Sequence, residues 1–149
     1  MIISFIGHSK IYKKRDIQTK IEEAILQNTV EDEPIFFYCG GYGDFDLLCL
    51  KALLNIKKER RGCQMVLITP YLNTPKHLKD KLDLFDQLIY PPIETVPIKF
   101  AIVARNKWMI DKADLIISYI NRDYGGAYSA LSYAKRKKKR IINLSYCDE

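Results

Sequence analysis

Residues 105–135 read RNKWMIDKADLIISYINRDYGGAYSALSYAK, and this stretch decides the predicted fold. The pattern predicts the end of a helix, a buried strand over residues 115–120, a loop closing on Gly125-Gly126, and a new helix. A strand, a glycine-rich loop and a helix in this order present backbone N–H groups and the positive end of the helix dipole to an anion. The stretch therefore predicts an anion-binding turn.

The same order of elements occurs earlier in the chain. Residues 35–38 are a predicted strand, Cys39-Gly40-Gly41-Tyr42-Gly43 is the turn, and a helix with an apolar stripe follows. Further strands are predicted over residues 2–6, 65–69, 87–90 and 140–144, and further helices over residues 11–27, 97–112 and 127–138. Strands that alternate with helices predict one Rossmann-like α/β domain over residues 1–149, with a mostly parallel sheet of about six strands and helices on both faces.

The composition fits a cytoplasmic protein. Of its 149 residues, 48% are hydrophobic, and no apolar run reaches the roughly 20 residues that a membrane helix needs. The first residues lack the pattern of a signal peptide, so we expect a cytoplasmic location and no membrane partner. The four cysteines and two histidines show no metal-ligand spacing, so we expect neither a metal nor another cofactor. The net charge of +6 suits an anionic ligand or a nucleic acid.

Small and polar residues follow the predicted strands at the edge where parallel strands end. They are Gly7, His8 and Ser9 after the first strand, Gly40, Gly41, Gly43, Asp44 and Asp46 after the second, and Gly125, Gly126, Tyr128 and Ser129 after the fifth, with Arg105 and Asn106 on the helix before it. Open parallel sheets bind ligands at this edge, where the strand order reverses. We therefore expect one shared crevice for a nucleotide or nucleotide-derived small molecule.

Asp44 and Asp46 distinguish the first glycine turn from the second. Both lie in the first turn of the predicted helix, where the dipole favours a carboxylate but the carboxylate repels phosphate. They are better placed to accept hydrogen bonds from ribose hydroxyls or from a base amino group. A structural interpretation is also open, in which Asp44 caps the helix and Asp46 is an ordinary first-turn acid.

Arg105 lies on an apolar helical stripe, where a charge needs a partner. It can reach the second glycine turn and offer a bidentate fork to phosphate. The alternative is an internal ion pair with Asp111 or Asp114. Asn106 either takes part in the site or caps and braces the neighbouring loop.

Several motifs together resemble the SLOG superfamily, as in a small bacterial or phage member. The residues that carry the resemblance are Arg105-Asn106, Met109, Ala113-Asp114, Ile116-Ile117 and Gly125-Gly126-Ala127-Tyr128, with Ile6-Gly7-His8-Ser9 and Cys39-Gly40-Gly41-Tyr42-Gly43 plus Asp46 similar to its YpsA-like branch. This group joins the DNA-processing protein DprA (Smf), YpsA-like proteins and LOG proteins. The resemblance spans nearly the whole chain and implies a Rossmann-like fold that binds nucleotides or nucleotide-derived ligands.

The resemblance also implies an enzymatic alternative, because LOG enzymes are phosphoribohydrolases that cleave the N-glycosidic bond of nucleoside monophosphates. Their motif pairs an arginine, matched by Arg105, with a glutamate whose place falls near Leu131 and Ser132, where this chain has no acid. A carboxylate is the group that stabilises an oxocarbenium-like centre or activates water. A hydrolase would therefore have to use Asp44 or Asp46 in place of that acid, and we expect Asp46 together with Arg105 as its catalytic residues.

Three functions remain open from the sequence. The first is a binding module, such as a sensor, carrier or sequestering protein for a nucleotide-derived ligand, and the second is the N-glycosidase-type hydrolase. The third is single-stranded DNA binding, suggested by the DprA resemblance and the basic run over residues 135–140. Such a run at a helix C-terminus is usually solvated, and aromatic residues concentrate elsewhere, so nucleic acid is possible but not favoured. Phe100, Trp108 and Tyr133 exceed what one small core needs, which predicts a homo-oligomer.

Overall fold

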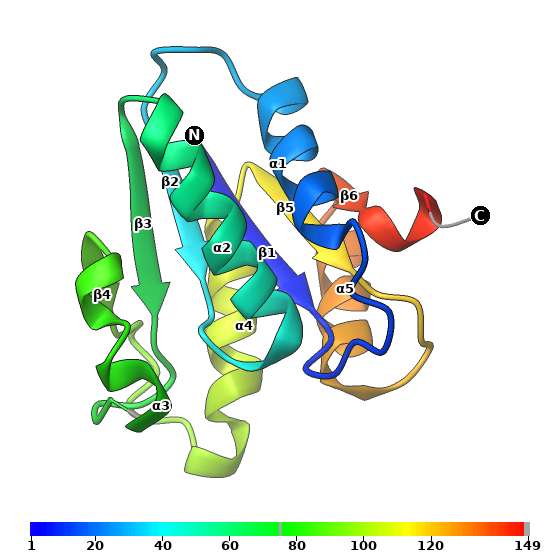
Figure 1. The fold of residues 1–149 in the computed structure, drawn as a ribbon. Coiled ribbons are helices and arrows are strands. Elements are labelled where there is room, and N and C mark those ends of the chain that lie inside the picture. The colour runs from blue at the N-terminus through cyan, green and yellow to red at the C-terminus, as the bar shows by residue number, and fades with distance from the viewer. Residues whose placement is uncertain (75, 148–149) are drawn as a thin grey trace.

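A parallel sheet lies between two layers of helices in the computed structural model, which describes residues 1–74 and 76–147 (Figure 1). The six strands are β1 (Ile2–Gly7), β2 (Ile35–Cys39), β3 (Cys63–Ile68), β4 (Gln87–Ile89), β5 (Leu115–Tyr119) and β6 (Ile141–Asn143). They are ordered β4-β3-β2-β1-β5-β6, and every neighbouring pair is parallel. The predicted Rossmann-like α/β fold is confirmed.

The strand β1 lies inside the sheet and is buried on both faces. Ile3 pairs with Phe37 of β2 on one side and with Leu115 of β5 on the other. This burial explains the continuous apolar run of the strand, because a strand covered on both faces needs no polar alternation. The chain continues from β1 to β2 on one side and returns later to β5 on the other. The strand order therefore reverses between β1 and β5, the position where such sheets bind ligands.

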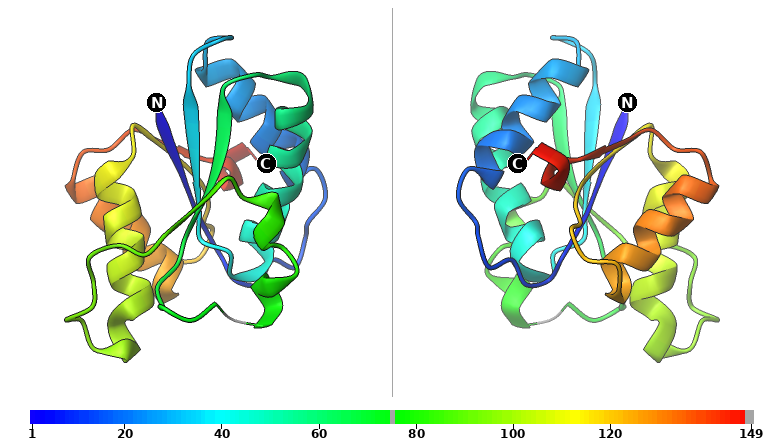
Figure 2. Two further views of the ribbon diagram at one scale, coloured as in Figure 1. Left: turned by 90° about the vertical axis from the view of Figure 1, so that its left-hand side faces the viewer. Right: turned by 90° about the vertical axis from the view of Figure 1, so that its right-hand side faces the viewer.

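Helices cover both faces of the sheet, as the edge-on views show (Figure 2). The helices α1 (Ile17–Asn28) and α2 (Gly43–Glu59) pack together on one face, and α4 (Ala101–Lys112) and α5 (Gly125–Arg136) pack together on the other. The short helix α3 (Lys76–Lys79) and the 3-10 turns Leu82–Leu84 and Ile98–Phe100 lie in connections between strands and helices, and a further 3-10 turn, Leu144–Cys147, follows β6. Within the described residues, no helix is long and apolar enough to cross a membrane.

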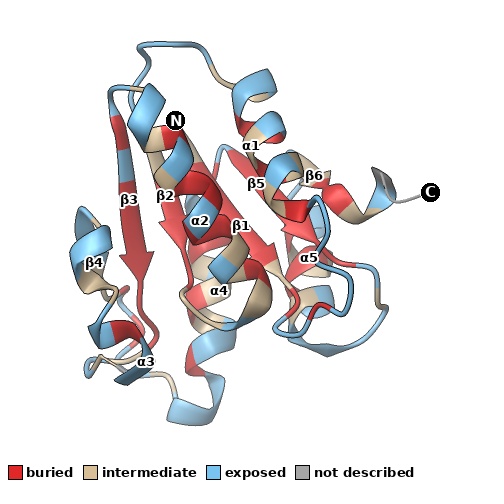
Figure 3. Cartoon of the chain, viewed as in Figure 1, coloured by how far each residue is buried: buried red, intermediate tan, exposed pale blue. Residues whose placement is uncertain are grey.

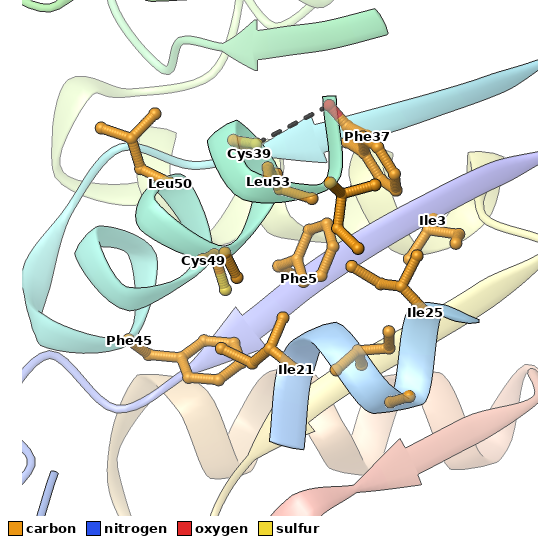
Figure 4. Packing of buried hydrophobic residues seen from close by; sticks show 14 of the residues in the cluster. Ile3, Phe5, Ile21, Ile25, Phe37, Cys39, Phe45, Cys49, Leu50 and Leu53 are labelled. Carbon is orange, nitrogen blue, oxygen red and sulfur yellow. Dashed lines mark hydrogen bonds between the residues drawn. The ribbon is translucent and has the colours of Figure 1, made fainter. Parts of the chain in front are cut away.

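Each helix layer buries an apolar core of its own against the sheet (Figure 3). The core beneath α1 and α2 includes Phe5, Ile21, Phe37, Phe45 and Leu53, all of them fully buried (Figure 4). The core beneath α4 and α5 includes Ile6, Val66, Met109, Ile116 and Leu131. Full burial of one such side chain is worth about 1.5–3 kcal/mol, so the two cores fix the helices and, with them, the loops at the strand ends.

The structure corrects three predicted helix boundaries. The first helix begins at Ile17, not at residue 11, because the Ile11 N–H donates to the Asp44 carboxylate (2.8 Å) in a loop that precedes the helix. The last helix begins at Gly125, so the glycine pair is its first turn and not the loop before it. The helix predicted from Pro97 begins with the 3-10 turn and becomes α-helical only at Ala101.

Candidate functional site

A crevice of about 380 Å³ lies at the carboxyl ends of β1, β2 and β5. The predicted site residues that line it are Gly7, His8, Ser9, Gly40, Asp46, Arg105, Asn106, Gly125 and Gly126. Its volume falls within the range of about 300–1,000 Å³ that small-molecule sites usually have. The fold therefore brings residues from four separate segments of the sequence to one cavity.

The loop after β1 lines this crevice and its carbonyls contact the start of α2. The N–H groups of Asp44 and Phe45 donate to the backbone carbonyls of Ser9 (2.8 Å) and His8 (3.3 Å). The N–H of Tyr42, the residue just before α2, donates to the Asp46 carboxylate at 2.7 Å. Since these amides already have partners, the start of α2 is not an anion site, although its sequence has the same order of elements as α5.

His8 is buried and acts as a hydrogen-bond acceptor. Its Nε2 accepts the Asn121 N–H at 3.0 Å, which requires that this nitrogen is unprotonated. Burial lowers the pKa of His8 and the positive charge of Arg122 lowers it further, against an opposing effect of the Asn121 side chain. A neutral His8 fixes the loop after β5 beside the loop after β1, so it braces the crevice.

The start of α5 differs from the start of α2 because it is open. A Cβ atom placed on Gly125 or Gly126 would meet nothing within 4 Å, and the first turn of α5 contains no acid. Gly125 has a φ of +91°, a conformation that glycine adopts without strain. Unpartnered amides at a helix start, together with the dipole, favour an anion.

Arg122 supplies a cation at the same end of the crevice, and the sequence analysis missed it. It lines the crevice, its Nη2 donates to the Lys10 carbonyl at 2.7 Å, and its guanidinium lies 5.4 Å from the centre of the Tyr12 ring. Its place in the loop between a buried strand and a glycine pair was a usable signal. Tyr42, Ile102 and Tyr124 also line the crevice and were missed; they had no distinguishing pattern.

Arg105 is buried, with 3% of its surface exposed, and its hydrogen bonds tie the crevice wall together. Its Nη1 donates to the carbonyls of Gly40 and Ile68 at 2.8 Å each, and its Nε donates to the Asn106 side chain at 2.9 Å. Both hydrogens of Nη1 and the single hydrogen of Nε are thus used. Of the three guanidinium nitrogens of Arg105, only Nη2 has no hydrogen-bond partner among the described residues. The predicted bidentate fork to phosphate is therefore not available.

The predicted alternative partners of Arg105 were wrong. Asp111 accepts a hydrogen bond from the Tyr133 hydroxyl at 2.7 Å, and Asp114 accepts one from the Ile2 N–H at 2.8 Å. Asn106 braces Arg105 itself. From α4, Arg105 therefore donates hydrogen bonds to carbonyls at the ends of β2 and β3. The apolar stripe in the sequence does not reveal these partners.

Asp46 lies across Gly40 from Arg105 and has a perturbed pKa. Burial raises the pKa of Asp46 to about 6, against the opposing effects of the Arg105 guanidinium and the Tyr42 N–H. A Cβ atom on Gly40 would lie 2.9 Å from Asp46 Oδ2 and 3.3 Å from Arg105 Cζ, so only glycine leaves room between them. Perturbed carboxyl groups in a cleft mark candidate functional sites.

Asp44 turns away from the crevice, and this corrects two predictions. Its carboxylate accepts the Ile11 N–H at 2.8 Å and lies 3.4 Å from the Lys14 ammonium, and the Ile11 hydrogen bond is the main cause that lowers the pKa of Asp44. It is not the N-cap of α2, since Tyr42 occupies that position. Asp44 instead lines a second cavity of about 240 Å³ with Gly41 and Gly43.

Two predicted positions on α5 lie outside the crevice lining. Tyr128 and Ser129 are one turn into the helix, and both are at the surface. Leu131, which stands near the place of the LOG glutamate, is buried in the core beneath α4 and α5. No carboxylate from this part of α5 therefore reaches the crevice.

A second surface feature lies where the middle of α4 meets the end of α5. Three cations lie within 5.4–5.9 Å of the Tyr133 ring centre, and they belong to Lys107, Arg136 and Lys137. Most aromatic residues lie away from the basic run in the sequence, but Tyr133, two residues before it, lies beside these cations. Trp108 lies nearby on α4, stacked on Tyr38 with ring centres 5.7 Å apart.

Among the described residues no group of three or more His, Cys, Asp or Glu side chains is arranged to hold a metal ion. The three cysteines for which a state is described, Cys39, Cys49 and Cys63, are free thiols in the protein interior. The polar chemistry of the crevice therefore comes from its carboxylate, guanidinium groups and backbone amides.

Comparison with known proteins shows the fold class of this chain. No family model and no curated protein matches the sequence. Solved structures do match. DNA processing protein A (DprA) from Streptococcus pneumoniae is 17% identical and aligns over 93% of this chain and 48% of its own, with a TM-score of 0.66. DprA from Helicobacter pylori, described in terms of its single-stranded DNA binding mode, is 15% identical over 95% of this chain and 63% of its own, with a TM-score of 0.65.

The protein TM1055 is also similar, with 14% identity, a TM-score of 0.60, and coverage of 95% of this chain and 72% of its own. The chain spans about half the length of the pneumococcal DprA chain and less than two thirds of the other. The chain therefore shares the Rossmann-like fold of these solved structures.

Proposed function

We propose that this protein binds a nucleotide or nucleotide-derived small molecule in the crevice between β1 and β5. The observation that carries the proposal is the arrangement of unlike polar groups along one cavity. At one end the open start of α5 and Arg122 suit a phosphate, and at the other Asp46 and Arg105 suit a group that both donates and accepts hydrogen bonds. The cytoplasmic location expected from the sequence fits such a ligand.

Identification of the ligand that co-purifies with the protein tests this proposal. The full chain is purified without added ligand, denatured, and its released small molecules are identified by mass spectrometry. Isothermal titration with AMP, CMP, GMP and UMP follows. We expect a bound phosphorylated nucleoside derivative, or micromolar binding of at least one monophosphate. The absence of both would contradict the proposal.

Single-stranded DNA binding is the second candidate, favoured by the surface around Tyr133. Half-buried Tyr133 with Lys107, Arg136 and Lys137 combines a ring for base stacking with cations for phosphates. The solved DprA structure from H. pylori is described as binding single-stranded DNA. Fluorescence anisotropy with a labelled 30-nucleotide strand tests this candidate. We expect Arg136→Ala combined with Lys137→Ala to weaken binding at least fivefold, with Lys57→Ala combined with Lys58→Ala on α2 as the control.

Self-association is proposed from one exposed apolar surface. Ile98, Phe100, Ile102 and Val103 are 78%, 51%, 40% and 46% exposed at the start of α4, beside the crevice. Trp108 and Tyr133, by contrast, have aromatic or polar partners within the chain. Sedimentation velocity at micromolar concentration should show a species larger than the monomer, and replacement of Phe100 and Val103 by Ser should shift it to monomer.

A further inference from the structure

Asp46 and Arg105 approach the same point of the crevice without forming an ion pair. Both line the cavity, and both lie within 3.3 Å of the point where Gly40 would carry a Cβ atom. Among the described residues, Asp46 Oδ1 and Arg105 Nη2 have no hydrogen-bond partner. One acceptor oxygen and one donor nitrogen therefore remain available on two side chains that line the same cavity and meet at Gly40.

Backbone hydrogen bonds hold both side chains in place, so that they do not close on each other to form an ion pair. Arg105 is tied to the carbonyls at the ends of β2 and β3, and Asp46 is tied to the Tyr42 N–H. Preorganised groups lose little freedom when a ligand binds, so their remaining hydrogen bonds contribute more to affinity. The arrangement also constrains the ligand, because the group that fits must donate to a carboxylate and accept from a guanidinium.

A sugar hydroxyl meets this requirement and a phosphate does not. A hydroxyl has one donor hydrogen and two acceptor lone pairs, whereas an ionised phosphate is repelled by the Asp46 carboxylate. Two neighbouring hydroxyls can satisfy both protein groups at once. The start of α5 and Arg122, which we propose for the phosphate, belong to the segment after β5, whereas Gly40 follows β2 on the other side of β1.

We propose that Asp46 and Arg105 bind the vicinal 2′- and 3′-hydroxyls of a ribose, so that the site selects ribonucleotides over 2′-deoxyribonucleotides. This inference rests on the proposed nucleotide-binding function and names the sugar that the site takes. It also reassigns Arg105 from the phosphate to the sugar. A buried polar group that loses its hydroxyl partner discriminates strongly against the analogue that lacks it.

The smallest probes that test this inference are ribose 5-phosphate and 2-deoxyribose 5-phosphate, which share the phosphate and carry no base. Their affinities for the full chain are measured at pH 7.5 by titration of 1H–15N NMR spectra. A charge-assisted hydrogen bond corresponds to about a tenfold to hundredfold change in affinity. We expect ribose 5-phosphate to bind at least tenfold more tightly.

The matched variants are Asp46→Asn and Asp44→Asn, which make the same chemical change two residues apart. Asp46→Asn should reduce the preference for ribose at least threefold, because a neutral amide is a weaker acceptor than a carboxylate. Asp44→Asn should leave the preference unchanged, since that side chain bonds to the Ile11 N–H outside the crevice. Both variants are compared only after their NMR spectra confirm the native fold.

The outcomes separate this inference from the function beneath it. If AMP, CMP, GMP or UMP binds and its 2′-deoxy counterpart binds within twofold of it, the ribose assignment is wrong while nucleotide binding stands. The same conclusion follows if the wild type prefers ribose and Asp46→Asn keeps that preference in full. If none of these nucleotides or sugar phosphates binds, the proposed function and the inference both fail.

Discussion

The two glycine turns of this protein have similar sequences and different physical states. At the start of α2, the first amides donate to the carbonyls of His8 and Ser9 and to the Asp46 carboxylate. At the start of α5, the positions of Gly125 and Gly126 face open space. A glycine turn before a helix is therefore an anion site only where no other part of the chain occupies the helix start, and here only the second turn meets that condition.

The largest expected effect separates the two arginines that line the crevice. Arg105→Ala should lower the free energy of unfolding by about 2–5 kcal/mol, because it leaves the buried carbonyls of Gly40 and Ile68 without a donor. Arg122→Ala, at the open turn, should change stability by less than about 1 kcal/mol. Urea denaturation of both variants measures the difference.

The same two variants also show which arginine contributes to the affinity for the phosphate group. Arg122→Ala should weaken a nucleoside 5′-monophosphate about tenfold to hundredfold and change the affinity of the nucleoside far less, because we propose that the phosphate binds beside Arg122. Isothermal titration with both ligands measures this. If instead Arg105→Ala folds as stably as the wild type and loses only the phosphorylated ligand, the two arginines have been assigned the wrong way round.

A second pair of substitutions compares packing at the two turns. A Cβ atom on Gly7 would lie 2.3 Å from the Phe45 ring, so Gly7→Ala should destabilise the protein by about 1–3 kcal/mol through overpacking against α2. Gly126→Ala meets nothing within 4 Å and should be neutral or slightly stabilising, since alanine favours a helix. Equal losses of stability would show that both turns are packed alike. Thermal unfolding followed by circular dichroism distinguishes these results.

The raised pKa of Asp46 predicts that its ionised carboxylate destabilises the folded protein. Folding raises this pKa from an ordinary value of 3.8 to about 6, so the native protein binds a proton that the unfolded chain releases between these pH values. The contribution of Asp46 to the free energy of unfolding therefore falls as the pH rises through that window. Asp46→Asn should stabilise the protein by about 1–3 kcal/mol at pH 7.5, and the gain should shrink towards zero near pH 4. A variant that is less stable than the wild type at pH 7.5 would show that the ionised carboxylate is well accommodated.

The smallest effect is expected in catalysis. We expect no measurable release of free base from AMP, CMP, GMP or UMP, because buried Leu131 occupies the region where a LOG enzyme has its acid. Acid–base assistance is typically worth 10²- to 10⁴-fold in rate, and phosphate binding at the open turn does not replace it. Chromatography of overnight incubations provides the measurement. Base release that disappears in Asp46→Asn would identify an enzyme with a relocated carboxylate.

The sequence by itself determined the order of strands and helices, the parallel sheet, and the edge at which the glycine turns meet. These follow from local patterns, because apolar periodicity and glycine position reflect interactions between residues close in the chain. The sequence also shows that Leu131 and Ser132 stand where a LOG enzyme has its acid. The first helix was placed too early because Ile11 bonds to Asp44, a partner 33 residues away.

Only the tertiary structure decided which turn is open and which atoms of Arg105 remain available. Arg105 reaches Gly40 and Ile68 across 65 and 37 residues, and the start of α2 is occupied by the loop after β1. The pKa of Asp46 likewise depends on burial, with contributions from Arg105 and the Tyr42 N–H. Hydrogen-bond satisfaction and desolvation arise only when distant segments meet, so no local pattern encodes them.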